Sequence, residues 1–356
     1  MATFRRLLWS LAVLLTIALL YLLFWPVPIS PVAWNPPPAP SLIGDYQQNS
    51  RLSTTERLSL GTGFGPEGVA IDSSGKIFAG IEDGRIIRLL ANGTQPEVVA
   101  DTHGRPLGLI FDPNGNLVVA DAKKGLLSIS LDGTVNRLVT EAGGIPLHCS
   151  NDLDLATDGT VYFTDASKFP LSMFKADLLE HQSSGRLIAY DLQRKSTRVL
   201  LPHLSFANGV AISPDQSFVL AVETGNYRVD RFWLKGPKQG QSDVFIDNLP
   251  GFPDGISSNG KGKFWLALVS PRDPLFDKLM PYPWLRKVVL RLPESLQPAP
   301  KRYGFVLGLD MNGRVVDNLQ DGSTDCYAEI AKAVEHQGKL YFGSIGESAV
   351  GRFTIR

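Results

Sequence analysis

The chain has 356 residues, with 35 Lys and Arg against 35 Asp and Glu, so its formal net charge at pH 7 is zero. This balance argues against a nucleic-acid-binding protein, because phosphate contacts require a surplus of basic side chains. Two cysteines exclude a disulfide-stapled scaffold and a cysteine-rich zinc or iron–sulfur module. A hydrophobic content of 44% allows a large core and excludes general disorder.

The first element in chain order is an apolar N-terminal segment. Residues 7–25 (LLWSLAVLLTIALLYLLFW) carry no charge and would span roughly 28 Å as a helix, close to the roughly 30 Å of a bilayer core. Arg5 and Arg6 precede this run and the next charged residue is Asp45. The positive-inside rule therefore predicts a single-pass protein with a cytoplasmic N-terminus and the remainder on the periplasmic, extracytoplasmic or lumenal side. A cleaved signal peptide is the alternative, but no small-residue cleavage site follows directly, so we predict an uncleaved signal anchor over residues 1–25.

A proline-rich segment follows the anchor. Residues 26–40 contain seven prolines, a composition that favours extended polyproline II. We predict that residues 26–41 form a semi-rigid linker that holds the globular part, residues 42–356, away from the bilayer.

The globular part repeats one unit six times. Each unit has a short apolar strand, a turn rich in Gly and Asn or Asp, and a second apolar strand, and most units add a third strand such as GRIIRL. About 50 residues per unit is the size of a four-stranded propeller blade. We predict an all-β, six-bladed β-propeller, since a β-sandwich would not require six copies. The copies lie at 66–81, 106–121, 150–165, 207–222, 253–268 and, in degenerate form, 328–344.

Alignment of the copies on their turn residue places one residue of each at the start of the innermost strand. By pseudo-symmetry these six residues form a ring around the propeller axis at one face: Glu67, Leu107, Asn151, Asn208, Asp254 and Ile330. Two carboxylates and two amides at a crowded axis would be left without partners unless something compensates them. Four oxygen ligands with two negative charges suit Ca²⁺ better than zinc. We predict a calcium site on Glu67, Asn151, Asn208 and Asp254, although Asn or Asp before Gly is also common in ordinary turns.

The same motifs carry a family resemblance. The chain resembles the six-bladed propellers of the gluconolactonase/senescence-marker-protein and strictosidine-synthase-like superfamily, and among them the membrane-anchored members of the adipocyte plasma membrane-associated type. The matching stretches cover most of residues 61–346 and include GPEGVAID, NDLDLATDGTVYFTDAS, FANGVAISPDQSFVLAVET, PGFPDGI and EHQGKLYFGS. The resemblance implies a calcium ion on Glu67, Asn151, Asn208 and Asp254, and a hydrolase of lactones, aryl esters or organophosphates.

The function that follows is a membrane-anchored, calcium-dependent hydrolase of lactones or aryl esters. Asp254 is the first candidate for the catalytic base, and His148, three residues before Asn151, is the second. Two alternatives stay open. One is a non-catalytic binding propeller that calcium only stabilises. The other is the amine–aldehyde condensation of strictosidine synthases, for which Glu329 is not clearly matched to the family glutamate.

Two long insertions between strands supply the surroundings of the ring. Residues 166–184 and 270–287 both follow second strands and are predicted to overhang the metal. The second carries several large apolar side chains, which predicts either the entrance for a hydrophobic ester or lactone or a surface that dips into the bilayer. Cys149 and Cys326 are predicted to be unpaired, because opposite blades are too far apart for a disulfide.

Overall fold

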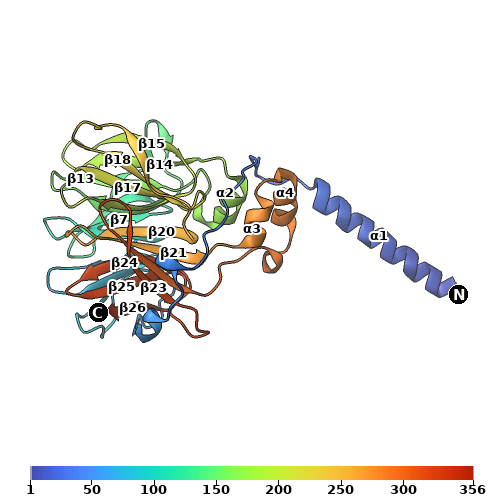
Figure 1. Cartoon of the computed structure of the whole chain (residues 1–356), viewed down its shortest axis with the longest axis horizontal. Coiled ribbons are helices and arrows are strands. Elements are labelled where there is room, and N and C mark those ends of the chain that lie inside the picture. Colours follow the sequence, from blue (N-terminus) through green and yellow to red (C-terminus); the bar gives the residue numbers. More distant parts are fainter. Residues whose placement is uncertain (1, 356) are drawn as a thin grey trace.

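The computed structural model of the chain describes residues 2–355. Helix α1 (Ala2–Phe24) projects away from the rest of the molecule (Figure 1). Its residues Thr3–Phe24 are long and apolar enough to cross a membrane, and no residue of the apolar window is buried against the described chain. The predicted anchor is therefore an exposed apolar helix and a candidate membrane span. Met1, which belongs to the predicted anchor, lies outside the described residues.

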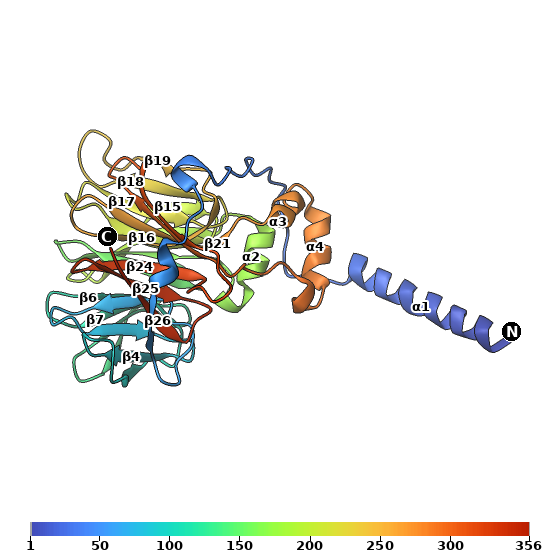
Figure 2. The same cartoon turned by 60° about the horizontal axis from the view of Figure 1, so that its bottom comes forward.

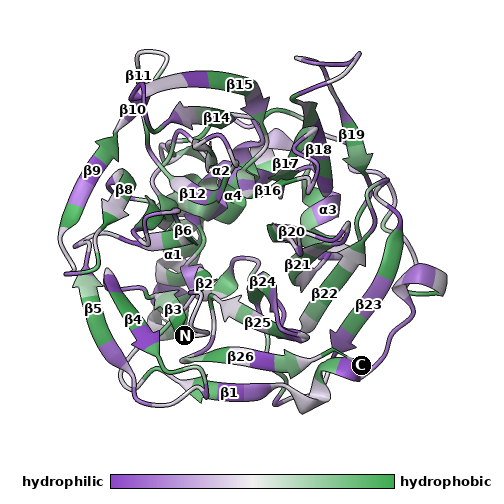
Figure 3. Ribbon diagram, turned by 90° about the vertical axis from the view of Figure 1, so that its left-hand side faces the viewer, coloured by the Kyte–Doolittle hydropathy of each residue, from purple (hydrophilic) through white to green (hydrophobic). Residues whose placement is uncertain are grey.

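All but two of the strands in residues 2–355 form six four-stranded antiparallel sheets arranged around a central axis, so the predicted six-bladed propeller is confirmed. Figure 3 looks along this axis and shows the first strand of each sheet at the centre. The first blade consists of β2 (Val69–Ile71), β3 (Ile77–Gly80), β4 (Arg85–Leu89) and β5 (Glu97–Asp101), and the second of β6 (Pro106–Phe111), β7 (Leu117–Asp121), β8 (Gly125–Ile129) and β9 (Val135–Val139). The third blade consists of β12 (Ser150–Leu155), β13 (Thr160–Asp165), β14 (Gly185–Asp191) and β15 (Ser196–Leu204), and the fourth of β16 (Ala207–Ile212), β17 (Phe218–Glu223), β18 (Arg228–Trp233) and β19 (Ser242–Ile246). The fifth blade consists of β20 (Gly251–Ser258), β21 (Phe264–Pro271), β22 (Gly304–Leu309) and β23 (Val315–Asp321), and the sixth of β24 (Ile330–His336), β25 (Lys339–Ser344), β26 (Ala349–Thr354) and β1 (Glu56–Ser59).

The sixth blade takes its outer strand from the other end of the globular part. β1 pairs antiparallel with β26, with Leu58 opposite Val350. The N-terminal strand β1 thus completes the sheet of the C-terminal blade and closes the ring of six blades. The outer edge of β26 is thereby paired. Apolar side chains of neighbouring sheets pack between the blades and form the core. A two-stranded hairpin of β10 (Glu141–Ala142) and β11 (Ile145–Pro146) lies outside the six sheets.

Glycine follows four of the six ring positions because the inner strands approach one another closely there. A Cβ at Gly68 would lie 1.7 Å from the carbonyl oxygen of Leu107 on the next blade, and a Cβ at Gly255 would lie 2.4 Å from that of Ala331. Gly108 and Gly209 meet neighbouring backbone in the same way. No side chain fits at these positions, which explains the recurring Gly after the ring residue.

Three short helices cover one end of the propeller. α2 (Phe174–Glu180) lies in the insertion between β13 and β14, and α3 (Pro274–Leu279) and α4 (Pro283–Arg291) lie in the insertion between β21 and β22. Figures 1 and 2 show them between the propeller and α1. We call α2, α3 and α4 with their connections the lid. Within residues 2–355 there are also four 3₁₀ helices: η1 (Gly44–Tyr46), η2 (Arg51–Thr54), η3 (Leu171–Met173) and η4 (Glu294–Leu296).

The proline-rich segment, residues 26–40, has no helix or strand, and its role as a spacer stays a prediction. It packs along the lid, where Ile29 is buried and the backbone N–H of Val32 donates to Glu180 O at 3.0 Å. The ring of Trp34 stacks on His181 with centroids 4.2 Å apart. Polyproline II leaves its backbone groups free, and here the lid supplies partners for them. We call residues 27–38 the strap.

Candidate metal centre

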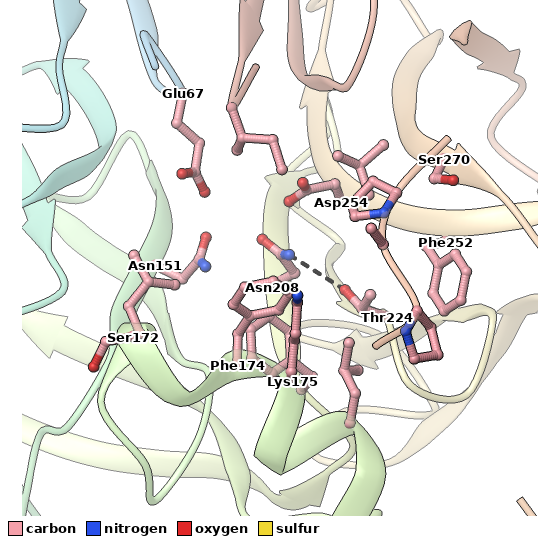
Figure 4. Close-up of a pocket in the computed structure, with 18 of the residues that line it drawn as sticks. Glu67, Asn151, Ser172, Phe174, Lys175, Asn208, Thr224, Phe252, Asp254 and Ser270 are labelled. Carbon is pink, nitrogen blue, oxygen red and sulfur yellow. Dashed lines mark hydrogen bonds between the residues drawn. The ribbon is translucent and has the colours of Figure 1, made fainter. Parts of the chain in front are cut away.

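The structure brings the four predicted metal ligands together. They come from four different blades, all are buried, and Figure 4 shows their side-chain oxygens facing one common space: Glu67, Asn151, Asn208 and Asp254. The ring positions of the two other blades are filled by Leu107 and Ile330, which are also buried. Separate segments of the chain thus converge on a single point at the lid end of the axis.

A local irregularity of the inner strands turns three of these side chains toward the axis. The register between the first and second strand of the blade shifts at the ring residue in each case. A bulge takes a residue out of the regular pairing and re-aims its side chain. The shifts fall between Ser150 and Leu153, between Ala207 and Val210, and between Pro253 and Ile256.

Asn208 presents an unpartnered oxygen to the common space. Its Nδ2 donates to Thr224 Oγ1 at 3.2 Å, and the Thr224 hydroxyl donates onward to Pro253 O at 2.7 Å, so the amide orientation is defined. Asn208 Oδ1 is buried and has no hydrogen-bond partner among residues 2–355. A buried acceptor left without a partner costs about 1–3 kcal/mol. A cation bound between the four side chains would satisfy it.

Burial and nearby carboxyl groups disfavour the charged form of both carboxyl groups of the ring. Burial is the main cause that raises the pKa of Asp254 well above its usual range, and the nearby Glu67 and Asp152 raise it further. Burial also raises the pKa of Glu67, although Arg105 opposes this effect through an ion pair of 3.0 Å between Nη2 and Oε2. A divalent cation between the two carboxylates would remove this penalty, because it favours the ionised form of both.

An internal ion pair lies next to the ring and was not predicted. Lys332 on β24 pairs with Asp152 Oδ2 on β12 and also donates to Ile256 O at 2.7 Å. Asp152 Oδ2 accepts the backbone N–H of Val210 at 3.0 Å. One sequence signal points to it: Asp152 stands in the third copy where four other copies have glycine.

Acidic residues at the ends of second strands fix the loops that lead to the ring, and this too was missed. Asp121 Oδ2 accepts the backbone N–H of Arg105 at 2.9 Å, and Asp165 Oδ1 accepts that of Cys149 at 2.8 Å. Glu223 Oε2 accepts the backbone N–H of Ser205 at 2.5 Å. The sequence signal that could have revealed these contacts is an acidic residue that recurs at the end of the second strand, as in VVAD, YFTD and LAVE.

The structure does not bring His148 to the centre. Its side chain is exposed and it does not line the cavity beside the ring, while its backbone N–H is held by Asp165 Oδ1 at 3.0 Å. His148 is close to Asn151 in sequence, but its side chain is exposed while Cys149 and Asn151 are buried. Glu329 also lies outside the residues that line the cavity. Of the two base candidates, only Asp254 lies in the site.

A cavity of about 440 Å³ lies between the ring and the lid. Its apolar wall comes largely from the two insertions, so the prediction that they overhang the ring is confirmed; the second extends beyond 287, and residues 297–300 also line the cavity. Lys123 and Lys175 supply positive charge to the lining. The cavity therefore suits an apolar molecule with a polar group that reaches the ring. The wall includes Leu171, Phe174, Leu178, Phe252 and Phe276.

The donor set is one of hard oxygen ligands. Within residues 2–355 there is no group of three or more His, Cys, Asp or Glu side chains placed to hold a metal. Two carboxylates with two amides are instead a set that fits calcium, with further oxygens from backbone or water. Cys149 and Cys326 are buried and free, as predicted, and burial raises the pKa of the Cys149 thiol well above its usual range.

Comparison with known proteins identifies the family. The family model for strictosidine synthase matches residues 151–237, and that for the N-terminal part of strictosidine synthase-like proteins matches residues 44–89. An adipocyte plasma membrane-associated protein from Bos taurus is 36% identical over 96% of this chain and 88% of its own length. The chain belongs to the strictosidine synthase-like family. A second member, strictosidine synthase-like 10 from Arabidopsis thaliana, is 39% identical over 81% of this chain and 84% of its own length.

Solved structures with the same fold are more distant. A gluconolactonase from Xanthomonas campestris superimposes with a TM-score of 0.63 at 18% identity and covers 93% of this chain and 98% of its own. Regucalcin from Agrobacterium tumefaciens, described as a calcium-binding protein, gives a TM-score of 0.59 at 16% identity, over 85% of this chain and 94% of its own. At this identity the likeness shows a common propeller fold.

Proposed function

We propose that this protein is a membrane-anchored, calcium-dependent hydrolase of lactones or aryl esters. The observation that carries the proposal is the unpartnered, buried Asn208 Oδ1 in a ring with two carboxyl groups, at the floor of an apolar cavity. The names of two relatives in fold, a gluconolactonase and a calcium-binding regucalcin, support the same direction. We further propose that α1 is an uncleaved anchor with a cytoplasmic N-terminus, so that the propeller lies on the other side of the membrane.

In this proposal the four ring residues hold the cation. Bound there, calcium would supply electrostatic stabilisation for the negative charge that develops on the carbonyl oxygen of the ester. Arg105 orients the Glu67 carboxylate, and Thr224 orients the Asn208 amide. Asp254 is the group that takes a proton from the attacking water, and the cation would keep it in the ionised form that accepts this proton. The apolar wall of the cavity binds the acyl or aryl part and excludes water from it.

Hydrolysis of phenyl acetate and of an aliphatic lactone by the full-length protein in detergent, with and without chelator, tests the proposal. We expect chelation to abolish turnover and added calcium to restore it. We expect Asp254→Asn and Asn208→Ala to lower kcat/KM on the order of 100-fold, because each removes a ligand of the cation that would stabilise the oxyanion. Calcium binding is measured on the same samples by isothermal titration.

Glu82→Gln is the matched control, because Glu82 lines the cavity but lies outside the ring. This variant makes the same carboxylate-to-amide change as Asp254→Asn and is expected to keep calcium binding and turnover. Full activity after complete removal of calcium would reject the hydrolase mechanism. Calcium binding that raises the melting temperature without any turnover of esters or lactones would instead indicate a non-catalytic binding propeller.

A further inference from the structure

The lid exposes several large apolar side chains. Leu275, Tyr282 and Trp284 are 60%, 52% and 59% exposed, and Leu296 nearby is 65% exposed. All four belong to the insertion between β21 and β22. Single exposed apolar residues need no explanation, but four large ones within one insertion make it a candidate for contact with another apolar surface.

This insertion is joined directly to the end of the apolar helix α1. Arg291 Nε donates to Trp25 O at 2.6 Å, and Arg291 Nη1 donates to Leu22 O at 2.8 Å. Trp284 and Lys287 are seven and four residues before Arg291 in α4, so the three side chains lie on one face of that helix. The face of α4 that carries Trp284 is therefore the face that turns toward α1.

The contact with α1 sets the depth of α4 relative to a bilayer. Thr3–Phe24 has 22 residues, so it is about 33 Å long and spans a hydrocarbon core from end to end. Trp25 then lies at the membrane surface, and Arg291 lies at the same depth because it binds the Trp25 carbonyl. In Figure 2 α4 lies beside the end of α1 nearest the propeller and runs across the direction of α1. Trp284 and Arg291 belong to this same nine-residue helix, so they are about 11 Å apart along its axis.

The chemistry of the surface fits lipid headgroups. Tyr and Trp side chains concentrate at membrane interfaces, where their rings are apolar and their polar atoms remain hydrated. Lys278 and Lys287 add positive charge, and neither forms an ion pair with a carboxylate of the described chain. The acidic neighbours are already engaged: Asp277 pairs with Arg272 at 2.9 Å, and Glu294 pairs with Lys175 at 3.5 Å.

We propose that the outer face of the insertion between β21 and β22, with Leu275, Tyr282, Trp284 and Leu296, rests in the headgroup region of the same bilayer that holds α1. The lid is then a second membrane contact of this chain, and the cavity beneath it lies next to the lipid surface. The inference rests on α1 as a membrane span and does not depend on hydrolase activity. A second copy of this chain is the other occupant that the test separates.

Spin labels on the full chain in lipid nanodiscs test the proposal. Trp284→Cys and Leu275→Cys carry a nitroxide on the lid, and the native Cys149 and Cys326 are buried. Accessibility to oxygen, which concentrates in lipid, is compared with accessibility to a water-soluble nickel chelate. In nanodiscs with anionic lipid, we expect the labels at both lid sites to be more accessible to oxygen than to the chelate. In amphipol without lipid, we expect the same labels to be more accessible to the chelate.

Two labels are matched controls. Leu131→Cys places the nitroxide on an 85% exposed apolar position in the turn between β8 and β9, on the propeller face opposite the lid, where the chelate is expected to dominate. Leu14→Cys lies within α1 and reports whether that helix is in lipid. A lipid-buried label at Leu14 with lid labels as open to the chelate as Leu131 would overturn the proposal while leaving the anchor intact.

A label-free measurement guards against disturbance by the nitroxide. Brominated lipids quench tryptophan fluorescence on contact, and we expect Trp284→Phe to lose part of the quenched signal relative to the unmodified chain. Equal quenching in both proteins would contradict contact between Trp284 and lipid. Magnetic broadening between lid labels that appears in proteoliposomes and vanishes in nanodiscs with one chain would assign this face to a second copy and would also overturn the proposal.

Discussion

Lys332 is a largely buried cation near the propeller axis, and it forms an ion pair with one carboxylate, that of Asp152. It reaches from the sixth blade to Asp152 on the third and to the carbonyl of Ile256 on the fifth. The ammonium thereby joins three blades at the point where the ring adds two further carboxyl groups. The positive charge of Lys332 reduces the repulsion between Asp152 and the ring carboxylates. It lowers the pKa of Asp254, whereas Glu67 and Asp152 raise it.

Replacement of Lys332 by Met is expected to destabilise the protein by about 3–5 kcal/mol, because Asp152 is left buried without its counter-charge. The measurement is the free energy of unfolding in denaturant with calcium present and absent. The double variant Lys332→Met/Asp152→Asn removes both charges and is expected to recover part of the loss. If both variants are equally unstable, the loss comes from packing and not from charge.

At the scale of elements, the strap links the membrane helix to the lid. The guanidinium of Arg286, which is fully buried, donates to Leu179 O at 2.8 Å and to the strap carbonyl of Val32. Arg272 Nη2 donates to Pro37 O at 2.7 Å. A chain cut at the apparent domain boundary, residue 42, would therefore remove partners that buried lid residues use.

We expect a chain of residues 42–356 to have a less stable lid than a chain of residues 26–356. Loss of the strap exposes the Ile29 site and leaves the Arg286 guanidinium without one acceptor. Hydrogen exchange followed by mass spectrometry is expected to show faster exchange in α2 and α4 only in the shorter chain, with blades unchanged. Equal exchange in the two chains would show that the strap does not stabilise the lid.

The lid also has a pH-sensitive carboxyl group. Burial raises the pKa of Asp177 to about 6 from its usual 3.8, although hydroxyls of Ser167 and Ser184 donate to it. The folded protein then binds this proton more tightly than the unfolded chain, so the contribution to stability increases as pH falls from about 7 to about 4. Two pKa units correspond to on the order of 2–3 kcal/mol.

Asp177→Asn is the variant that isolates this effect, because an amide oxygen can still accept both hydroxyls and does not titrate. We expect the variant to be at least as stable as the natural chain at pH 7 and to lose the increase toward pH 5. Melting temperatures of the two proteins across this range are compared as a difference, since other groups titrate in both. Parallel pH curves would contradict the assignment.

At the scale of the whole molecule, the propeller depends on closure by its N-terminal strand. Leu58 on β1 is buried in a cluster with residues of the first and last blades, among them Val69 and Tyr341. β1 therefore joins segments that are almost 300 residues apart in sequence. A substitution that weakens the packing of β1 is therefore expected to open the ring and to destabilise all six blades.

Leu58→Ala is expected to lower the free energy of unfolding by about 2–4 kcal/mol, in the range for a large-to-small change in a core. The whole propeller is expected to lose stability together, with one transition seen by circular dichroism and by tryptophan fluorescence. Leu131→Ala at an exposed position is the control and is expected to change stability by less than about 0.5 kcal/mol. Two separate transitions in Leu58→Ala would contradict a cooperative ring.

The sequence by itself determined the six blades, the exposed apolar helix and the convergence of the four ring residues. These features are repeated at a fixed spacing or depend on local composition, so a pattern read along the chain is enough to place them. Pseudo-symmetry then carries Glu67, Asn151, Asn208 and Asp254 to one axis without any knowledge of side-chain contacts.

The tertiary structure decided what is not repeated. It placed His148 outside the cavity, docked the strap on the lid and paired Lys332 with Asp152 across the axis. It also showed that the amide of Asn208 is turned by Thr224 so that its oxygen faces the ring. Each of these outcomes depends on contacts between single residues far apart in sequence, where the free energy is set by burial and hydrogen-bond geometry and leaves no periodic trace in the chain.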